Sequence, residues 1–460
     1  MDLFDNVSPL DYRYYGRSKS FEKLKEYFSE NSRIKYFCLA ELALVKALAR
    51  RNICTEKTVK EVGEAIQKVT AEEVYAEEDR IKHDIRALAN CIRSKVSEES
   101  KPFIHFGATS YDIVDTANAL RFKKASLELV VPKLLELEKT LIELALREKQ
   151  TLQIGRTHGQ HAEPLTFGFA IASIASRLAG RIKQIQKNSE GLVGKFSGAV
   201  GAYNATSLLV EDPLKLEEEI LEELGLNASI SSTQIVEAEP LTDLMHSLTS
   251  CFGVLANLAD DLRHLQRSEI SEVAESFGKE QVGSSTMPHK RNPINFENVK
   301  SFWKHFMPRM TSVYLDQVSE HQRDLTNSAS QRFLPELFVA LYLSAERLNE
   351  ACKKLVVDKE RMLENFGKNK DFIIAEPLYI LLAFHKHPNA HEFVKQLTLK
   401  AQVEKKPFTK VVQEEPEMQE YLKKFSKEQK EIIANPEKYL GKAVEKTEKI
   451  CEHWKKELAL

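Results

Sequence analysis

The sequence predicts an all-α protein built around a few long helices, and three observations support this fold class. Apolar residues recur at helical spacing through three long segments, as in helices that bury one face. Only 17 glycines and 15 prolines occur in 460 residues, fewer than a turn-rich β fold usually contains. Strand patterns do not alternate with helices, and neither a G-x-G-x-x-G nor a Walker loop occurs, which argues against a nucleotide-binding parallel sheet.

The first apolar stripe repeats every seven residues, with a second set three residues after each later leucine. Such an a/d seam packs against neighbouring helices in a left-handed supercoil. Pro132 interrupts the seam, because proline lacks an amide donor and collides with the preceding turn. We therefore expect either a kink at Pro132 or the meeting of two helices. The stripe comprises Leu120, Leu127, Leu134 and Leu141, together with Val130, Leu137 and Leu144.

Two further stripes keep the same mixture of three- and four-residue spacing, and each is long enough to span a small domain. We interpret all three stripes as packing surfaces that form the frame of the protein. One consists of Phe167, Ile171, Ile174, Leu178, Ile182 and Ile185; the other consists of Leu244, Leu248, Cys251, Leu255, Leu258, Leu262 and Leu265. Shorter, more charged helices on either side predict three domains: an N-terminal helical domain (1–104), a central long-helix bundle (105–355) and a C-terminal helical domain (356–460).

Charge and cysteine content argue against several classes of protein. The 66 basic and 68 acidic side chains leave a net charge of −2, unlike a general binder of nucleic acid or anionic membranes. The six cysteines are far apart and include no C-x-x-C pair, unlike a disulfide framework or a zinc ribbon. The sequence shows no secretion signal and no apolar run of roughly 18 residues. We therefore expect a soluble, reduced, cytoplasmic protein.

Four polar segments interrupt the helical pattern, and polar loops of a helical protein are where binding and catalysis usually occur. The most informative is GSSTMPHKRNP, in which Ser284 follows a glycine and Lys290 and Arg291 add positive charge. Unpaired amides in such a loop could stabilise an anion, so that Ser284 could serve as a base or nucleophile. The segments are 102–112, 154–168, 194–204 and 283–293.

The segment GRTHGQHAEP carries His158 and His161, which would share a face on a helix and could there bind a metal. Two glycines and Pro164 instead predict a loop or the entry to a helix, and no H-E-x-x-H pattern occurs. Because Arg156 and Thr157 precede His158, we favour an anion-binding acid–base site over a metal site.

Other motifs are weaker when taken singly. Arg323 and Arg332, with hydroxyls between them, could grip carboxylate or phosphate oxygens, or could lie on a solvated helix face. The pairs His83-Asp84 and Arg13-Tyr14 are weaker evidence for a binding site when taken by themselves. The cluster of His385, His387 and His391 lacks Cys or carboxylate partners at ligand spacing, so we interpret it as part of a surface helix.

Together these motifs resemble the fumarase/aspartase superfamily. GSSTMPHKRNP is similar to its signature loop, and HFGATSYD and GRTHGQHAEPLTFG occur in the expected order. SPLDYRY, STQIVEAEP, RHLQRSEISEV and HQRDLTNSASQR resemble the adenylosuccinate lyase family within it. The resemblance runs from about residue 8 to about residue 340, whereas the C-terminal segment carries little specific signal.

The resemblance implies an all-helical homotetramer in which three subunits contribute to each active site around a central bundle of twenty helices. It implies cleavage of adenylosuccinate to AMP and fumarate. It also implies cleavage of the succinylated aminoimidazole carboxamide ribotide to the free carboxamide ribotide and fumarate. The reaction is a β-elimination that breaks a C–N bond without a metal or an organic cofactor. It requires a base, an anion hole for the carbanion and an acid for the departing nitrogen.

The same resemblance implies roles for individual residues. Ser284 matches the base, Lys290 the cation that stabilises the developing carboxylate charge, and His158 the general acid. Glu297 matches the carboxylate that pairs with this histidine, and His83 matches a histidine at the substrate. The residues that match substrate-binding positions are Arg13, Tyr14, Asp84, Thr109, Ser110, Thr157, Gln234, Asn292, Arg323, Ser328 and Arg332, and Lys195 and Asn204 are expected to line the site as well.

Three alternatives remain open. A sister lyase acting on argininosuccinate, aspartate or malate would not need Arg13-Tyr14 and the paired arginines, because those substrates carry no phosphate. A helical scaffold without activity would not need Ser284, His158 and Lys290, which are all present. A zinc enzyme that uses the histidine pairs would lose its activity to a chelator.

Overall fold

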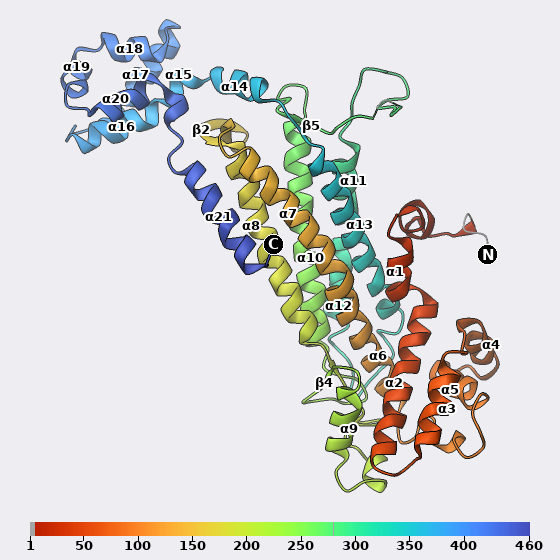
Figure 1. Ribbon diagram of the computed structural model, residues 1–460. Helices are drawn as coiled ribbons and strands as arrows, with labels where there is room; N and C mark the ends of the chain where they lie inside the picture. Colours follow the sequence, from red (N-terminus) through yellow and green to blue (C-terminus); the bar gives the residue numbers. More distant parts are fainter. Residues whose placement is uncertain (1–4, 279) are drawn as a thin grey trace. The chain divides into compact units, whose positions relative to one another are not determined.

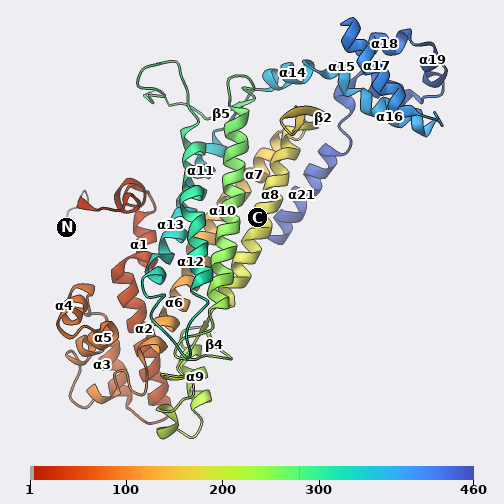
Figure 2. The same ribbon diagram turned by 180° about the vertical axis from the view of Figure 1, so that it is seen from behind.

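The computed structural model describes residues 5–278 and 280–460 and is mostly helical, as the sequence predicts (Figure 1, Figure 2). Backbone contacts divide the chain into two compact units. Unit 1 comprises Met1–Leu134, Gly180–Gly253 and Ser301–Glu346, and unit 2 comprises Leu135–Ala179, Val254–Lys300 and Arg347–Leu460. The borders between the units fall inside long helices, and the division into three domains stays a prediction.

Long helices bear the predicted apolar stripes (Figure 1). Every named member of the stripe from Phe167 to Ile185 is buried, and the third stripe is buried from Leu244 to Leu262. The packing interpretation of both stripes is therefore confirmed. The first stripe runs through α6 (Ser110–Lys124) and α7 (Val131–Arg147), the second lies on α8 (Phe167–Glu190), and the third lies on α10 (Glu239–Leu265). Two further long helices are α11 (Ile294–Phe306) and α13 (Leu334–Lys353).

Pro132 lies at the start of α7, directly after a π-helical segment, η5 (Ala125–Val130). The wider turn accommodates a proline ring that would collide with the preceding turn of an ordinary α-helix. It also explains why Leu127 is only half-buried, whereas Leu129 and Val130 are buried. An extra residue in the turn shifts the buried face by one position, and the seven-residue repeat does not anticipate this shift.

Shorter elements complete unit 1. Helix α6 stacks on α13 through the rings of Phe122 and Phe338, whose centroids lie 5.2 Å apart. β3 (Val193–Gly194) and β4 (Asn227–Ala228) form a short parallel pair. The remaining helices are α1 (Phe21–Phe28), α2 (Glu30–Arg50), α3 (Glu56–Ile66), α4 (Ala71–Ile81), α5 (Asp84–Arg93), α9 (Pro213–Glu222) and α12 (Met310–Leu315).

Unit 2 contains a group of small helices that pack on their own apolar core, which includes Leu378, Val394 and Phe408. β5 (Val273–Ala274) pairs with β6 (Val356–Val357) in antiparallel fashion. The shorter helices of unit 2 are α14 (Lys359–Gly367), α15 (Lys370–Ile373), α16 (Ala375–Phe384), α17 (Ala390–Glu404), α18 (Phe408–Glu414), α19 (Pro416–Leu422), α20 (Lys427–Ala434) and α21 (Ala443–Glu457).

Two predictions about local structure are wrong. Residues 154–168 were expected to form a loop or the entry to a helix, but β1 (Leu152–Thr157) and β2 (Gln160–Thr166) form an antiparallel hairpin there. His387 was assigned to a surface helix, but it is buried between the rings of Phe393 and Tyr421, with Nε2 3.1 Å from the Glu417 carboxylate. Aromatic packing explains this burial, which helical spacing did not reveal.

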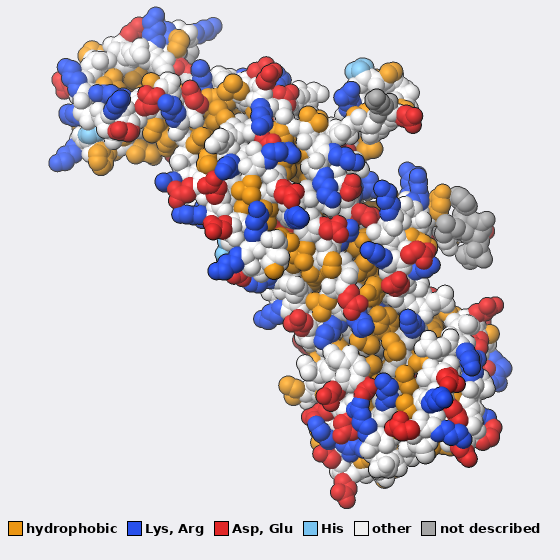
Figure 3. All heavy atoms as spheres, in the orientation of Figure 1, with side chains coloured by type: hydrophobic (Ala, Val, Ile, Leu, Met, Phe, Trp, Pro, Cys, Tyr) orange, Lys and Arg blue, Asp and Glu red, His pale blue; other side chains and the backbone are white. Residues whose placement is uncertain are grey.

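The surface agrees with the charge balance of the sequence. Basic and acidic side chains are interspersed over the face shown in Figure 3. All six cysteines are buried. None of the helices that the structure describes has the length and apolar character to cross a bilayer. Across residues 5–278 and 280–460, no group of three or more His, Cys, Asp and Glu side chains could hold a metal ion.

Glu138 on α7 is an isolated buried carboxyl group. Neither of its oxygens has a hydrogen-bond partner among the described residues, and burial raises its pKa to about 8. Between the pKa of about 4.3 in the unfolded chain and this value, the folded state holds a proton that the unfolded state has lost. The contribution of Glu138 to stability therefore falls as the pH rises through this window.

We expect Glu138→Gln to remove this dependence of stability on pH. The variant should match the native protein within about 1 kcal/mol of unfolding free energy at pH 5, and should exceed it by at least about 2 kcal/mol at pH 8. Urea denaturation at the two pH values measures the difference. Glu143→Gln, at an exposed position of the same helix, is the control. Equal effects of Glu138→Gln at both pH values would contradict the assignment.

Candidate active site

The candidate residues fall into both units, and each group is described within its own unit. Unit 2 holds Thr157, His158, Ser284, Lys290, Asn292 and Glu297. Unit 1 holds Arg13, Tyr14, His83, Asp84, Thr109, Ser110, Gln234, Arg323, Ser328 and Arg332.

His158 lies at the tip of the β1–β2 hairpin. Thr157 pairs with Gln160, so that only His158 and Gly159 form the turn. Both residues have positive φ angles, 53° and 75°, as a two-residue type I′ turn requires. The turn leaves His158 exposed, where its imidazole can exchange a proton with a bound molecule.

A buried carboxylate, Glu272, anchors the strand that leads to His158. Its side chain is inaccessible to solvent and accepts hydrogen bonds from Arg156 Nη1 (3.2 Å), Gln153 Nε2 (2.9 Å) and Asn365 Nδ2 (3.0 Å). Arg156 Nη2 donates a further bond of 2.5 Å. Because these donors come from β1 and α14, Glu272 ties the hairpin to a helix of the same unit. No motif of the sequence singles out Glu272.

Residues 283–293 form a loop, here called the serine loop, whose two ends lie close together. Asn292 Nδ2 donates to the carbonyl of Gly283 (2.9 Å), and a Cβ atom on Gly283 would lie 2.1 Å from the carbonyl oxygen of Lys290. This close approach requires glycine. The hydroxyl of Ser284 accepts hydrogen bonds from the amides of Thr286 (3.4 Å) and Met287 (3.1 Å). Backbone donors aimed at a serine oxygen can stabilise negative charge there.

Helix α11 positions Glu297 in its first turn. The buried carboxylate of Glu275 holds the start of this helix by accepting bonds from the amides of Asn295 and Phe296, both at 2.9 Å. Within the described parts of unit 2, no hydrogen bond or ion pair joins Glu297 to His158. Their pairing stays a prediction. Lys290 is exposed on the serine loop.

In unit 1, the structure brings Arg323 and Gln234 together. Arg323 Nη1 donates to Gln234 Oε1 (3.3 Å), and the guanidinium carbon lies 3.3 Å from the centroid of the Tyr111 ring. The Nε and Nη2 atoms of Arg323 are buried and have no hydrogen-bond partner among the described residues. A partly buried cation with two unused donors is suited to bind an anion.

Two helix starts carry further candidate residues. His83 caps α5, and its Nδ1 accepts a hydrogen bond from the amide of Arg86 (3.3 Å), so a neutral ring carries its proton on Nε2. Thr109 caps α6 in a capping box with Asp112. The free amides at such helix starts favour anionic groups nearby.

The other candidates in unit 1 are more dispersed. Arg332 Nη1 donates to the carbonyl of Ser328 (2.8 Å). Arg13 is exposed, and the Tyr14 ring lies edge-on to Phe302 at 4.5 Å. Lys195 is fully enclosed and pairs with Asp112, so it supports the start of α6 and does not present its ammonium group at a surface.

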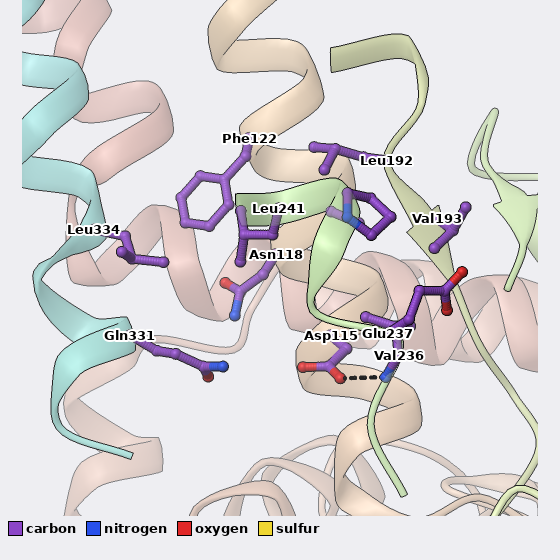
Figure 4. Close-up of a pocket in the computed structure, with 12 residues that line it drawn as sticks. Asp115, Asn118, Phe122, Leu192, Val193, Val236, Glu237, Leu241, Gln331 and Leu334 are labelled. Atoms are coloured by element: carbon purple, nitrogen blue, oxygen red, sulfur yellow. Dashed lines mark hydrogen bonds between the residues drawn. The ribbon is translucent and has the colours of Figure 1, made fainter. Parts of the chain in front are cut away.

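A small cavity of about 40 Å³ in unit 1 is lined mostly by apolar side chains (Figure 4). Asp115 and Gln331 point toward one another across it. Asp115 accepts a hydrogen bond from the amide of Val236 (3.0 Å), and burial raises the pKa of this carboxyl to about 7. This hydrogen bond to Val236 holds the backbone in place two residues after Gln234. The cavity has room for water and not for a nucleotide.

Comparisons with known proteins show the family to which this chain is related. A family model described as "Lyase" matches residues 14–305, and one described as "Adenylosuccinate lyase C-terminal" matches residues 319–439. The resemblance therefore extends beyond residue 340, where the sequence analysis ended it. The adenylosuccinate lyases of Pyrococcus horikoshii and Pyrococcus abyssi are 37% and 36% identical to this chain; each alignment covers 97% of this chain and 98% of the relative.

The fold has a counterpart among solved structures. The crystal structure of the 3-carboxy-cis,cis-muconate lactonizing enzyme of Pseudomonas putida matches with a TM-score of 0.81 at 24% identity, over 95% of this chain and 97% of the other. The family model that matches residues 14–305 defines a lyase of the fumarase/aspartase superfamily. Within that superfamily, the chain belongs to the adenylosuccinate lyase family.

We expect Glu272→Ala to destabilise unit 2. The change leaves the partly buried Arg156 without its ionic partner and removes the buried acceptor shared by β1 and α14, so unfolding free energy should fall by about 3 kcal/mol or more. Glu269→Ala, whose side chain is 76% exposed, should change it by less than about 0.5 kcal/mol. Denaturant unfolding of both variants measures the difference. Equal, small effects would show that the Glu272 contacts contribute little.

Proposed function

We propose that this chain is a lyase that cleaves adenylosuccinate to AMP and fumarate. It also cleaves the succinylated aminoimidazole carboxamide ribotide to the free carboxamide ribotide and fumarate, in purine nucleotide synthesis. The observation that carries the proposal is the serine loop, in which the Ser284 hydroxyl accepts from two backbone amides while Asn292 closes the loop at Gly283. Near full-length similarity to adenylosuccinate lyases supports the choice of substrate.

The reaction moves two protons and breaks one C–N bond. Ser284, as an alkoxide stabilised by the loop amides, removes a proton from the carbon next to a succinyl carboxylate. Lys290 stabilises the additional negative charge that this carboxylate acquires. The electron pair forms the double bond of fumarate as the C–N bond breaks, and His158 protonates the departing nitrogen. Glu297 holds His158 in the required tautomer, and His83 lies at the substrate.

The remaining candidates bind the two ends of the substrate. The residues assigned to the nucleotide phosphate and ribose are Arg13, Tyr14, Arg323, Ser328 and Arg332. Those assigned to the succinyl group and its surroundings are Asp84, Thr109, Ser110, Thr157, Gln234 and Asn292. The two unused donors of Arg323 support the assignment to an anionic group.

We further propose that the protein is a cytoplasmic homotetramer in which three subunits build each site around twenty central helices. The exposed position of His158 at a hairpin tip supports a role in a site completed by other copies. The reaction as proposed requires no metal and no organic cofactor.

The proposal is tested by adding adenylosuccinate to purified, chelator-treated protein. Stoichiometric release of AMP and fumarate, followed by ultraviolet absorbance and a fumarate assay, is the expected result. Release of fumarate only from argininosuccinate, aspartate or malate would assign the chain to a sister lyase. Loss of activity on chelation, with recovery on added zinc, would favour a zinc enzyme. No release from any of these substrates would favour a scaffold.

Ser284→Ala should lower turnover by at least about 100-fold and leave substrate binding largely intact, because it removes the group that transfers the proton. Ser285→Ala removes the neighbouring hydroxyl and is the matched control. Steady-state rates and the dissociation constant for AMP separate the two effects. Near-normal turnover of Ser284→Ala, or a larger loss in Ser285→Ala, would refute the assignment of the base.

Mixing two inactive variants tests whether sites are shared between subunits. His158→Gln and Ser284→Ala damage different parts of the site, so mixed tetramers would contain some sites in which both residues are native. We expect part of the activity to return after the subunits exchange. Absence of recovery, with exchange demonstrated by native mass spectrometry, would show that each subunit supplies both residues to its own site.

A further inference from the structure

Tyr111 lies under the guanidinium group of Arg323 in unit 1. The guanidinium carbon is 3.3 Å from the ring centroid, close enough for stacking and a cation–π interaction. Tyr111 belongs to the first turn of α6, one residue after Ser110. Its ring therefore connects this helix start to Arg323 on a distant segment of the chain. The resemblance to the family assigns no role to Tyr111.

Gln234 restrains Arg323 from another side. Gln234 Oε1 accepts from Arg323 Nη1, and the amide of Gln234 donates to the carbonyl of Gln322 (3.3 Å). Asp115, one helical turn after Tyr111, fixes the amide of Val236 (Figure 4). One face of α6 thus holds both Arg323 and the segment that carries its partner.

The donors that these contacts leave unused lie on Arg323 itself. Its Nε and Nη2 atoms are buried and have no hydrogen-bond partner among the described residues, whereas Nη1 is bonded to Gln234. Buried, unsatisfied donors on a cation are costly unless a ligand pairs with them. Nε and Nη2 lie on one edge of the planar guanidinium, where two oxygens of an anion can bind side by side.

We propose that Tyr111 is a positioning residue that fixes the guanidinium plane of Arg323, so that Nε and Nη2 bind two oxygens of a phosphate monoester. The inference rests on the proposed function, in which that monoester is the nucleotide phosphate. The ring supplies a flat, apolar support without competing for the two donors. The affinity for the phosphate group therefore depends on an aromatic ring at this position, and the hydroxyl of Tyr111 is dispensable.

The experiment compares the binding of AMP and adenosine to the full-length protein by titration calorimetry. Tyr111→Leu removes the aromatic face, and its dissociation constant for AMP should rise roughly 3- to 30-fold, the effect of one cation–π contact. Adenosine, which lacks the phosphate, should bind within about twofold of its native affinity. Tyr111→Phe keeps the ring and should bind AMP like the native protein.

Two controls isolate the contact. Tyr75→Leu alters a tyrosine of the same unit that bonds to Glu30 and should change neither affinity. In an Arg323→Met background, Tyr111→Leu should cause no further loss of AMP affinity, because the pair is already broken. If Tyr111→Leu does not fold, Tyr111→Met, of similar volume, replaces it.

Several outcomes would overturn the proposal: unchanged AMP binding in Tyr111→Leu, equal losses for AMP and adenosine, or the same loss of AMP affinity without Arg323. Turnover of adenylosuccinate is measured separately on the same variants. Protein that binds AMP as expected but releases no fumarate would refute the proposed function and leave the role of Tyr111 intact. If the native protein releases fumarate and Tyr111→Leu binds AMP normally, the proposed function stands and the role of Tyr111 is refuted.

Discussion

Buried carboxylates that accept several hydrogen bonds hold the polar segments of this protein to its helical frame. Glu272 anchors the hairpin that carries His158, and Glu275 anchors the start of the helix that carries Glu297. Asp112 has the same function at the start of α6, where it bonds to the amide of Thr109 and pairs with Lys195. A buried carboxylate is stable only when its donors are in place, so each of these segments has little freedom to move independently.

The frame itself could be predicted from the sequence because it follows a simple rule. Helices that pack along their length bury residues at intervals of three and four, and such intervals predicted the buried faces of α8 and α10. The rule failed at Leu127, where a π-turn adds a residue. It also gave no indication that His387 is buried, because stacking on Phe393 and Tyr421 depends on contacts between separate helices.

The candidate site was only partly predictable. The sequence motifs pointed to Ser284 and His158 as candidates, and the structure adds their local geometry. The hairpin was missed because Gly155 and Pro164 were interpreted as breaks in helical structure. His158-Gly159 between two alternating runs was the available signal for a tight turn. Glu272 and Glu275 were missed because an isolated acidic residue in a sequence usually indicates solvent exposure, and their donors lie far away along the chain.

The π-helical segment before Pro132 links two features of the sequence that are usually considered separately. An α-helix turns by about 100° per residue, so a residue lost from the middle of α7 would rotate everything after it away from the buried face. Within η5 the extra residue is already absorbed by the wider turn. A relative could therefore lose one residue from this turn and keep both flanking helices in register, provided that it also lost the proline. In this chain, the length of the turn and the proline that follows it therefore depend on each other.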